Sequence, residues 1–237
     1  MLKKLLLLSN STNFGEAYLE YPKSSIQSFL GDQIRKVLFV PYAGVGVSYD
    51  EYTRKVALPF TDVDYNLEGI HTFSNPVTAV ESAEAIAIGG GNTFELLNQL
   101  YRNNLLEPIR KRVEEGVPFM GWSAGSNVAG PSIKTTNDMP IIEPPSFDAL
   151  NLVPFQINPH YTEERLPNHG GETRKDRLYE FIALNPDVNV VGIPEGNLLQ
   201  IEGNKVKLVG EGSISIFRQG EEAKIYNSND DLGFLMS

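Results

Sequence analysis

Short apolar runs alternate with segments of helical spacing along most of the chain. Apolar runs that do not alternate with polar residues, and that glycine or proline bounds, predict strands buried on both faces. They lie at residues 5–8, 37–40, 66–71, 85–88, 117–120, 155–157 and 188–193. Apolar positions three or four residues apart predict helices at 94–101 and 105–113, and the composition of 173–184 also favours a helix. This order predicts a mostly parallel sheet with helices on both faces.

The pattern changes near the C-terminus. The apolar runs at 199–201, 205–209, 213–217 and 223–226 are joined by glycine-containing turns, which indicates short antiparallel strands. No linker rich in glycine, serine or proline divides the chain, and 237 residues with 41% hydrophobic positions suit one large domain. We therefore expect a single α/β domain over residues 1–237, with an antiparallel β flank at the C-terminal end.

The first residues, two lysines followed by leucines, superficially resemble a signal peptide. The leucine run ends at Ser9, whereas the apolar core of a signal peptide spans roughly 7–15 residues. A buried first strand is therefore the better interpretation. No other segment approaches the ~20 apolar residues of a membrane span, so we expect no membrane association.

Composition and charge argue against several kinds of partner and site. A formal net charge of −10 argues against nucleic-acid binding, which needs a basic surface. The chain has no cysteine, which removes thiol nucleophiles and thiolate metal sites and fits a reducing compartment. Three scattered histidines without a metal-binding motif indicate no metal, and we expect no cofactor.

Residues 121–125, with the sequence GWSAG, follow a predicted strand and match the G-x-S-x-G nucleophile elbow. In that motif a serine occupies a sharp strand-to-helix bend, and the glycines leave room for it. The bend exposes the hydroxyl, and free N–H groups of the following helix point at the same place. The alternative is an ordinary turn rich in small residues.

A serine hydroxyl needs a base, and histidine is the usual one near neutral pH. His71 lies in an apolar run, which favours packing, and His169 lies in a glycine-rich loop, which favours a solvated side chain. His160 follows a predicted strand, at the sheet edge where ligands bind in parallel α/β folds. His160 is therefore the candidate base for Ser123.

A third group must hold the imidazole, and two carboxylates are candidates. Asp138 lies in a polar loop and Glu195 lies in the turn after the strand 188–193, and both could reach His160. The N–H of Ala124 and the glycine run 89–91 could bind a developing oxyanion. A phosphate-binding loop is the other interpretation of the glycines, but they lack the residues of the known phosphate motifs.

Six blocks in order carry a resemblance to a known family. They are 89–93 (GGGNT), 121–125 (GWSAG), 136–140 (TNDMP), 156–160 (QINPH), 171–174 (GETR) and 194–197 (PEGN). Together they resemble the peptidase E family of α-aspartyl dipeptidases, from residue 5 to at least residue 222. The resemblance implies a fold like that of class I glutamine amidotransferases, with serine in place of their cysteine. It also implies a cytoplasmic serine peptidase that cleaves dipeptides with an N-terminal aspartate.

The resemblance implies Ser123 as the nucleophile and His160 as the base. The acidic member is described for the family at the positions matching both Asp138 and Glu195, so both remain candidates. We expect a small peptide as the partner of this site, and a monomer or a small homo-oligomer as the assembly.

The resemblance further implies that Gly91 and Ala124 supply the oxyanion N–H groups. Arg174 matches the arginine that binds the aspartate side chain of the substrate, and a guanidinium can hold a carboxylate through two parallel hydrogen bonds. Without the family match, a solvated helix-surface arginine near Glu172 and Asp176 would be the simpler interpretation.

Three other functions fit parts of the sequence. A cyanophycinase-like or other acyl hydrolase could use the same scaffold on aspartyl-containing substrates. An esterase of the α/β-hydrolase class fits the chain order, but Ser123 and His160 are closer in sequence than that fold usually places them. A ligand-binding protein with an inactive site is the third.

Overall fold

The computed structural model describes residues 2–164 and 170–237. Its main sheet has seven strands in the order β3-β2-β4-β5-β1-β8-β9. The parallel strands are β3 (Asn66–Gly69), β2 (Lys36–Val40), β4 (Ile86–Ile88), β5 (Phe119–Trp122) and β1 (Lys4–Leu8). The antiparallel hairpin β8 (Leu198–Glu202) and β9 (Lys205–Val209) extends the sheet beyond β1.

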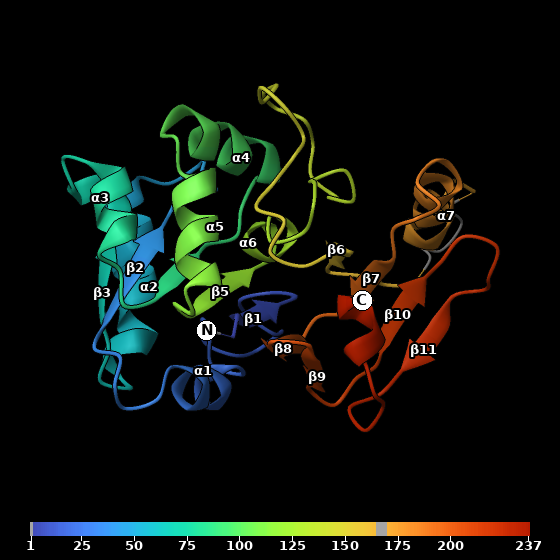
Figure 1. Ribbon diagram of the computed structural model, residues 1–237, viewed down its shortest axis with the longest axis horizontal. Coiled ribbons are helices and arrows are strands. Elements are labelled where there is room, and N and C mark those ends of the chain that lie inside the picture. Colours follow the sequence, from blue (N-terminus) through green and yellow to red (C-terminus); the bar gives the residue numbers. More distant parts are fainter. Residues whose placement is uncertain (1, 165–169) are drawn as a thin grey trace.

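Helices cover both faces of this sheet (Figure 1). One face packs against α3 (Pro76–Glu81), α4 (Thr93–Arg102) and α5 (Leu106–Glu114), and the other packs against α1 (Lys23–Leu30) and α2 (Tyr49–Thr61). The leucines of β1 alternate between the two layers because successive strand side chains point to opposite faces. Leu5 and Leu7 therefore belong to the first layer, and Leu6 and Leu8 to the second. The predicted mostly parallel sheet with helices on both faces is confirmed.

The strands on either side of α7 (Arg174–Leu184) were expected in the main sheet, and this expectation is wrong. β6 (Gln156–Pro159) and β7 (Val190–Ile193) form a parallel pair in a separate sheet with the order β11-β10-β7-β6. β10 (Ile214–Phe217) and β11 (Lys224–Tyr226) add to it in antiparallel orientation, as the C-terminal pattern predicts. Apolar runs indicate burial on both faces, but they carry no information on which sheet a strand joins.

β6, β7 and β10 of the second sheet are buried on both faces, which explains their apolar runs, whereas the edge strand β11 is largely exposed. On one side, Ile157, Val191 and Ile193 join the apolar cluster that contains α4 and α5 of the main unit. On the other side, Val190 and Phe217 pack against residues of α7. The two sheets thus share one core and lie side by side (Figure 1).

The predicted strand at residues 66–71 ends early. β3 stops at Gly69, and Ile70–Thr72 form a 3-10 helix. His71 lies there with Nε2 at 2.9 Å from a carboxylate oxygen of Asp50, so it makes a hydrogen bond as well as a ring contact with Tyr49. Within residues 2–164 and 170–237, we find no helix with the length and apolar character of a membrane span.

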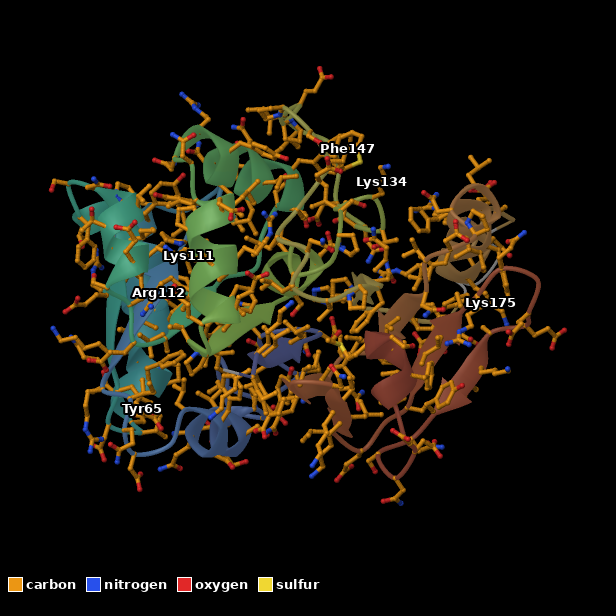
Figure 2. All side chains as sticks on the ribbon, viewed as in Figure 1. Tyr65, Lys111, Arg112, Lys134, Phe147 and Lys175 are labelled. Atoms are coloured by element: carbon orange, nitrogen blue, oxygen red, sulfur yellow. The ribbon has the colours of Figure 1, made fainter. Side chains whose placement is uncertain are left out.

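A long segment joins α6 (Ala124–Asn127) to β6 without regular strands or helices, as its loose pattern predicts. Phe147 of this segment, labelled in Figure 2, lies beside α4. Its ring packs edge-to-face on Phe94 of that helix, with ring centroids 6.2 Å apart. The segment includes Asp138, and it passes between the first residues of α4 and the end of β6.

Candidate active site

The strand-to-helix bend at Ser123 has the geometry that the GWSAG motif predicts. β5 ends at Trp122 and α6 begins at Ala124. Between them, Ser123 has φ 53° and ψ −115°, backbone angles that residues other than glycine rarely adopt. A Cβ atom at Gly121 would collide with the Gly125 carbonyl, and one at Gly125 would collide with the Ile88 carbonyl of β4. Both glycines are therefore needed for the arms of the bend to close against each other and against β4.

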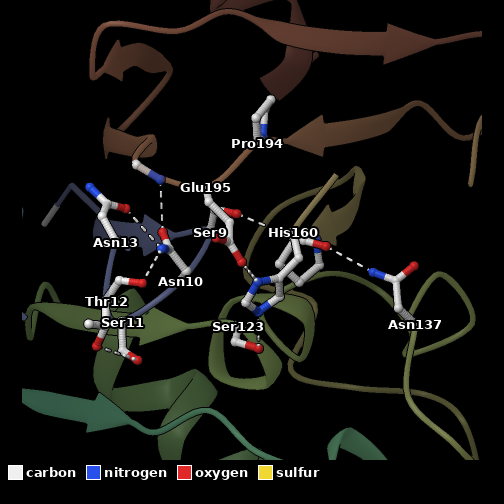
Figure 3. A network of polar contacts seen from close by, with 12 residues as sticks. Ser9, Asn10, Ser11, Thr12, Asn13, Ser123, Asn137, His160, Pro194 and Glu195 are labelled. Atoms are coloured by element: carbon white, nitrogen blue, oxygen red, sulfur yellow. Dashed lines mark hydrogen bonds and ion pairs between the residues drawn. The ribbon is translucent and has the colours of Figure 1, made fainter. Parts of the chain in front are cut away.

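The imidazole of His160 lies between Ser123 and Glu195 (Figure 3). Its Nε2 atom is 2.7 Å from Ser123 Oγ, and its Nδ1 atom is 2.6 Å from Glu195 Oε1. Ser123 and His160 are partly buried, whereas the Glu195 side chain is 57% exposed. The three groups come from three separate segments: the β5–α6 bend, the residue after β6 and the turn after β7.

Backbone contacts fix the position of His160. The residue has φ 54°, and its N–H donates to Ser9 Oγ at 2.9 Å. Ser9 Oγ donates in turn to the Ile193 carbonyl at 2.7 Å, so one hydroxyl joins the ends of β1, β6 and β7. Sequence reasoning did not single out Ser9, because a serine after a strand has no distinctive pattern.

Asp138 occupies a different place from Glu195. Its Oδ2 atom accepts hydrogen bonds from the Thr93 N–H at 2.7 Å and from the Thr93 hydroxyl at 2.6 Å. Thr93 is the first residue of α4, where free N–H groups and the helix dipole favour a carboxylate. Of the two candidate carboxylates, Glu195 is the one in hydrogen-bond contact with His160.

Two asparagines support the strand end that precedes His160. Asn158 Nδ2 donates to Asn137 Oδ1 at 3.0 Å, and Asn137 Nδ2 donates to the Pro159 carbonyl at 2.9 Å. This pair ties the loop of Asp138 to β6. The 136–140 and 156–160 blocks therefore meet in space.

The predicted oxyanion donors flank Ser123. Gly91 has φ 138°, and a Cβ atom there would collide with the Ala43 carbonyl. No group among the described residues accepts a hydrogen bond from the Gly91 N–H. Ala124 is the first residue of α6, so its N–H has no partner within the helix. A Cβ atom on Gly90 would lie 3.0 Å from Ser123 Cβ, which shows how closely the glycine loop approaches the serine.

Arg174 begins α7 and faces the same region. Its guanidinium donates to the His160 carbonyl, and Thr173 and Asp176 form a capping box that fixes the start of the helix. Burial lowers the pKa of Arg174, and the nearby Glu195 carboxylate opposes that shift. A half-buried guanidinium is suited to binding a carboxylate through charge-assisted hydrogen bonds.

The other histidines are not part of this arrangement. His71 pairs with Asp50. His169, predicted as a solvated loop residue, lies outside the described residues. In the part of the chain that the structure describes, no group of three histidine or acidic side chains is placed to hold a metal ion.

A serine on a strand-to-helix bend, in contact with an imidazole on an α/β scaffold, is the arrangement of a serine hydrolase. Residues 5–209 match the profile of Peptidase family S51. The chain belongs to this family and is a peptidase of the serine type.

Individual relatives are similar in sequence over nearly the whole chain. A Peptidase E from a Nostoc species is 52% identical over 236 residues, which cover 100% of this chain and 98% of the relative. A Peptidase E from Shewanella putrefaciens is 47% identical over 231 residues, 98% of each chain. The crystal structure of a peptidase from an acI-B1 actinobacterium has the same fold, with a TM-score of 0.70 at 16% identity, covering 98% of this chain and 97% of that one.

We predict that Gly125→Ala distorts the bend. The added Cβ would collide with the Ile88 carbonyl, a backbone atom that the sheet holds in place, so stability should fall by about 1–3 kcal/mol, and labelling of Ser123 should be lost. Gly46→Ala is the matched control, because a Cβ atom there has open space around it. Urea denaturation and labelling with a fluorophosphonate probe measure the two effects. Equal stability and labelling of both variants would contradict the close packing of the bend.

Proposed function

We propose that this chain is a dipeptidase that hydrolyses dipeptides with an N-terminal aspartate through an acyl-enzyme on Ser123. The observation that carries the proposal is the continuous contact from Ser123 Oγ to His160 Nε2 at 2.7 Å and from His160 Nδ1 to Glu195 Oε1 at 2.6 Å. The Peptidase E relatives and the family support the peptidase chemistry.

In the first half-reaction His160 removes the proton from Ser123 Oγ. The oxygen attacks the carbonyl carbon of the aspartyl residue and forms a tetrahedral oxyanion. His160 then donates that proton to the leaving amine as the C–N bond breaks. Water, deprotonated by His160, cleaves the resulting ester, releases aspartate and restores the serine.

Glu195 acts as the third member of this triad in our proposal. It accepts a hydrogen bond from His160 Nδ1–H, which leaves Nε2 free to take the serine proton, and it stabilises the imidazolium that forms. Asp138 instead stabilises the start of α4 and the neighbouring loop. The hydrogen bonds of its carboxylate to Thr93 support this division of roles.

Gly91 and Ala124 supply the N–H groups that bind the oxyanion. Arg174 binds the aspartate side chain of the substrate through charge-assisted hydrogen bonds. We place the enzyme in the cytoplasm, in agreement with the absence of cysteine, and propose that it works without metal, cofactor or nucleic acid.

We expect Ser123→Ala to reduce turnover of α-Asp-Leu by a factor on the order of 10⁴ to 10⁶, because the nucleophile is lost. A coupled assay of released leucine measures this. Activity near the unmodified level would reject the assignment. Parallel assays with β-Asp-Arg test the substrate class, since faster cleavage of that compound would identify a cyanophycinase-like enzyme instead.

The two carboxylates should respond differently to neutralisation. Glu195→Gln should lower kcat by at least about 10²-fold, because the amide no longer stabilises the imidazolium. Asp138→Asn, the matched control, should leave kcat within about threefold and lower stability by about 0.3–1 kcal/mol through weaker interaction with the start of α4. Steady-state kinetics and urea denaturation separate the two. A larger loss of kcat in Asp138→Asn than in Glu195→Gln would exchange the roles.

Arg174→Ala should lower kcat/KM for α-Asp-Leu by about 10- to 100-fold, the loss of a charge-assisted hydrogen-bond pair. Cleavage of Ala-Leu should stay within about threefold. Arg177→Ala is the control, because that side chain is 66% exposed and lies 3.9 Å from its Glu172 partner. An equal decrease for both substrates would show that Arg174 acts through its contact with the His160 carbonyl and not through substrate selection.

A further inference from the structure

The Tyr52 hydroxyl lies behind the glycine loop that approaches Ser123. Tyr52 belongs to α2, and only 8% of its surface is exposed. Its hydroxyl donates to the Gly90 carbonyl at 2.9 Å and accepts from Trp122 Nε1 at 3.3 Å. This hydroxyl therefore contacts both the glycine loop and the residue that precedes the nucleophile.

The Gly90 carbonyl and the Gly91 N–H belong to one peptide group. The bond between them is trans, so the carbonyl and the N–H point in opposite directions from one rigid plane. A hydrogen bond that fixes the carbonyl on the Tyr52 side therefore fixes the N–H on the opposite side. The direction of the Gly91 N–H is thus set by a residue that does not touch it.

The loop needs such an anchor because three successive glycines place little restriction on their own backbone. Its ends are held by hydrogen bonds from the Gly89 N–H to the Val40 carbonyl at 3.2 Å and from the Asn92 N–H to the Ala43 carbonyl at 2.9 Å. Neither bond involves the peptide between Gly90 and Gly91. Tyr52 supplies the hydrogen bond at that central peptide.

The tyrosine is itself held in place. Its ring packs edge-to-face on Phe39 with centroids 5.2 Å apart, and Phe39 stacks on Trp122 at 5.7 Å. Tyr18 Oη lies 3.4 Å from Tyr52 Oη. Burial raises the pKa of Tyr52 above the ordinary value of a tyrosine, so the hydroxyl remains a donor at neutral and moderately alkaline pH.

We propose that Tyr52 is a positioning residue of the hydrolase, which orients the peptide between Gly90 and Gly91 so that the Gly91 N–H faces the oxyanion. The inference rests on the proposed role of Gly91. It adds α2, an element with no residue in the triad, to the machinery that stabilises the transition state.

The test is Tyr52→Phe, which removes the hydroxyl and keeps the ring. Removing an oxyanion donor outright lowers kcat by about 10²- to 10³-fold; here the donor stays but its orientation is no longer fixed, so we expect about a tenfold decrease. KM for α-Asp-Leu should change by less than about twofold, because the effect is confined to the tetrahedral species. The rate constant for fluorophosphonate labelling of Ser123 should fall by about the same factor as kcat, because phosphorylation of the serine also develops negative charge there.

Tyr65→Phe is the matched control. Tyr65, labelled in Figure 2, is buried in the same apolar layer, and its hydroxyl lies 3.2 Å and 3.1 Å from the Gln27 and Gly31 carbonyls. Tyr65 precedes the edge strand β3, whereas Ser123 follows β5, so the two residues lie at opposite ends of the parallel strands. This variant loses a comparable buried hydrogen bond and should keep its kcat and labelling rate. Similar decreases in the two variants would reduce the role of Tyr52 to general stability and overturn the inference.

The labelling end point separates the remaining outcomes. It counts competent sites, so partial unfolding of Tyr52→Phe lowers the end point, whereas misorientation of the peptide lowers the rate constant. An unchanged rate constant and kcat in Tyr52→Phe would overturn the inference while leaving the peptidase intact. No labelling of the unmodified protein would refute the proposed function itself.

Discussion

The contact between Ser123 and His160 depends on the junction of two sheets. Ser123 follows a strand of the main sheet, and His160 follows a strand of the second sheet. A shift of one sheet against the other would lengthen the 2.7 Å distance between Ser123 Oγ and His160 Nε2, so the junction must be fixed to a fraction of an ångström. Apolar packing alone is not directional enough for this, because it tolerates small sliding movements.

Buried hydrogen bonds, which are directional, fix the position of one sheet relative to the other. Asn127 of α6 donates through Nδ2 to the Ile157 carbonyl of β6 at 2.7 Å, and the Thr135 hydroxyl donates to the same carbonyl at 2.9 Å. Ser9 adds the link between β1, His160 and β7. These polar groups are buried, and each would be costly to leave unpaired, so they select one register of the two sheets.

The sequence predicted the parts of the molecule whose patterns are local. The apolar runs located β1, β2, β4 and β5, and the GWSAG motif located the bend, because its glycines and small residues have a direct steric cause. The separate second sheet could not be predicted, since pairing between distant strands leaves no mark in either run. The same limit applies to Ser9 and to Tyr52, whose partners are brought close only by the fold.

The choice between Asp138 and Glu195 shows the same limit at the site. Both lie in polar loops, and nothing in the spacing distinguishes a carboxylate that contacts an imidazole from one that caps a helix. What distinguishes them is the position of α4: its first N–H group and the Thr93 hydroxyl engage Asp138, and Glu195 is left to contact His160.

Backbone strain converges on the proposed reaction centre. Ser123 at φ 53°, His160 at φ 54° and Gly91 at φ 138° all have positive backbone φ angles, which residues with a side chain rarely adopt. Ser123 and His160 nevertheless carry side chains. For the two residues that carry a side chain such conformations cost of order 1–3 kcal/mol each and persist only where surrounding contacts outweigh them, whereas glycine adopts its conformation without that cost. Here those contacts are the close fit of the bend against β4, the Ser9 bridge and the hydrogen bonds of the glycine loop. Substitutions that weaken these supports should therefore release the strain and lower activity before the fold is lost.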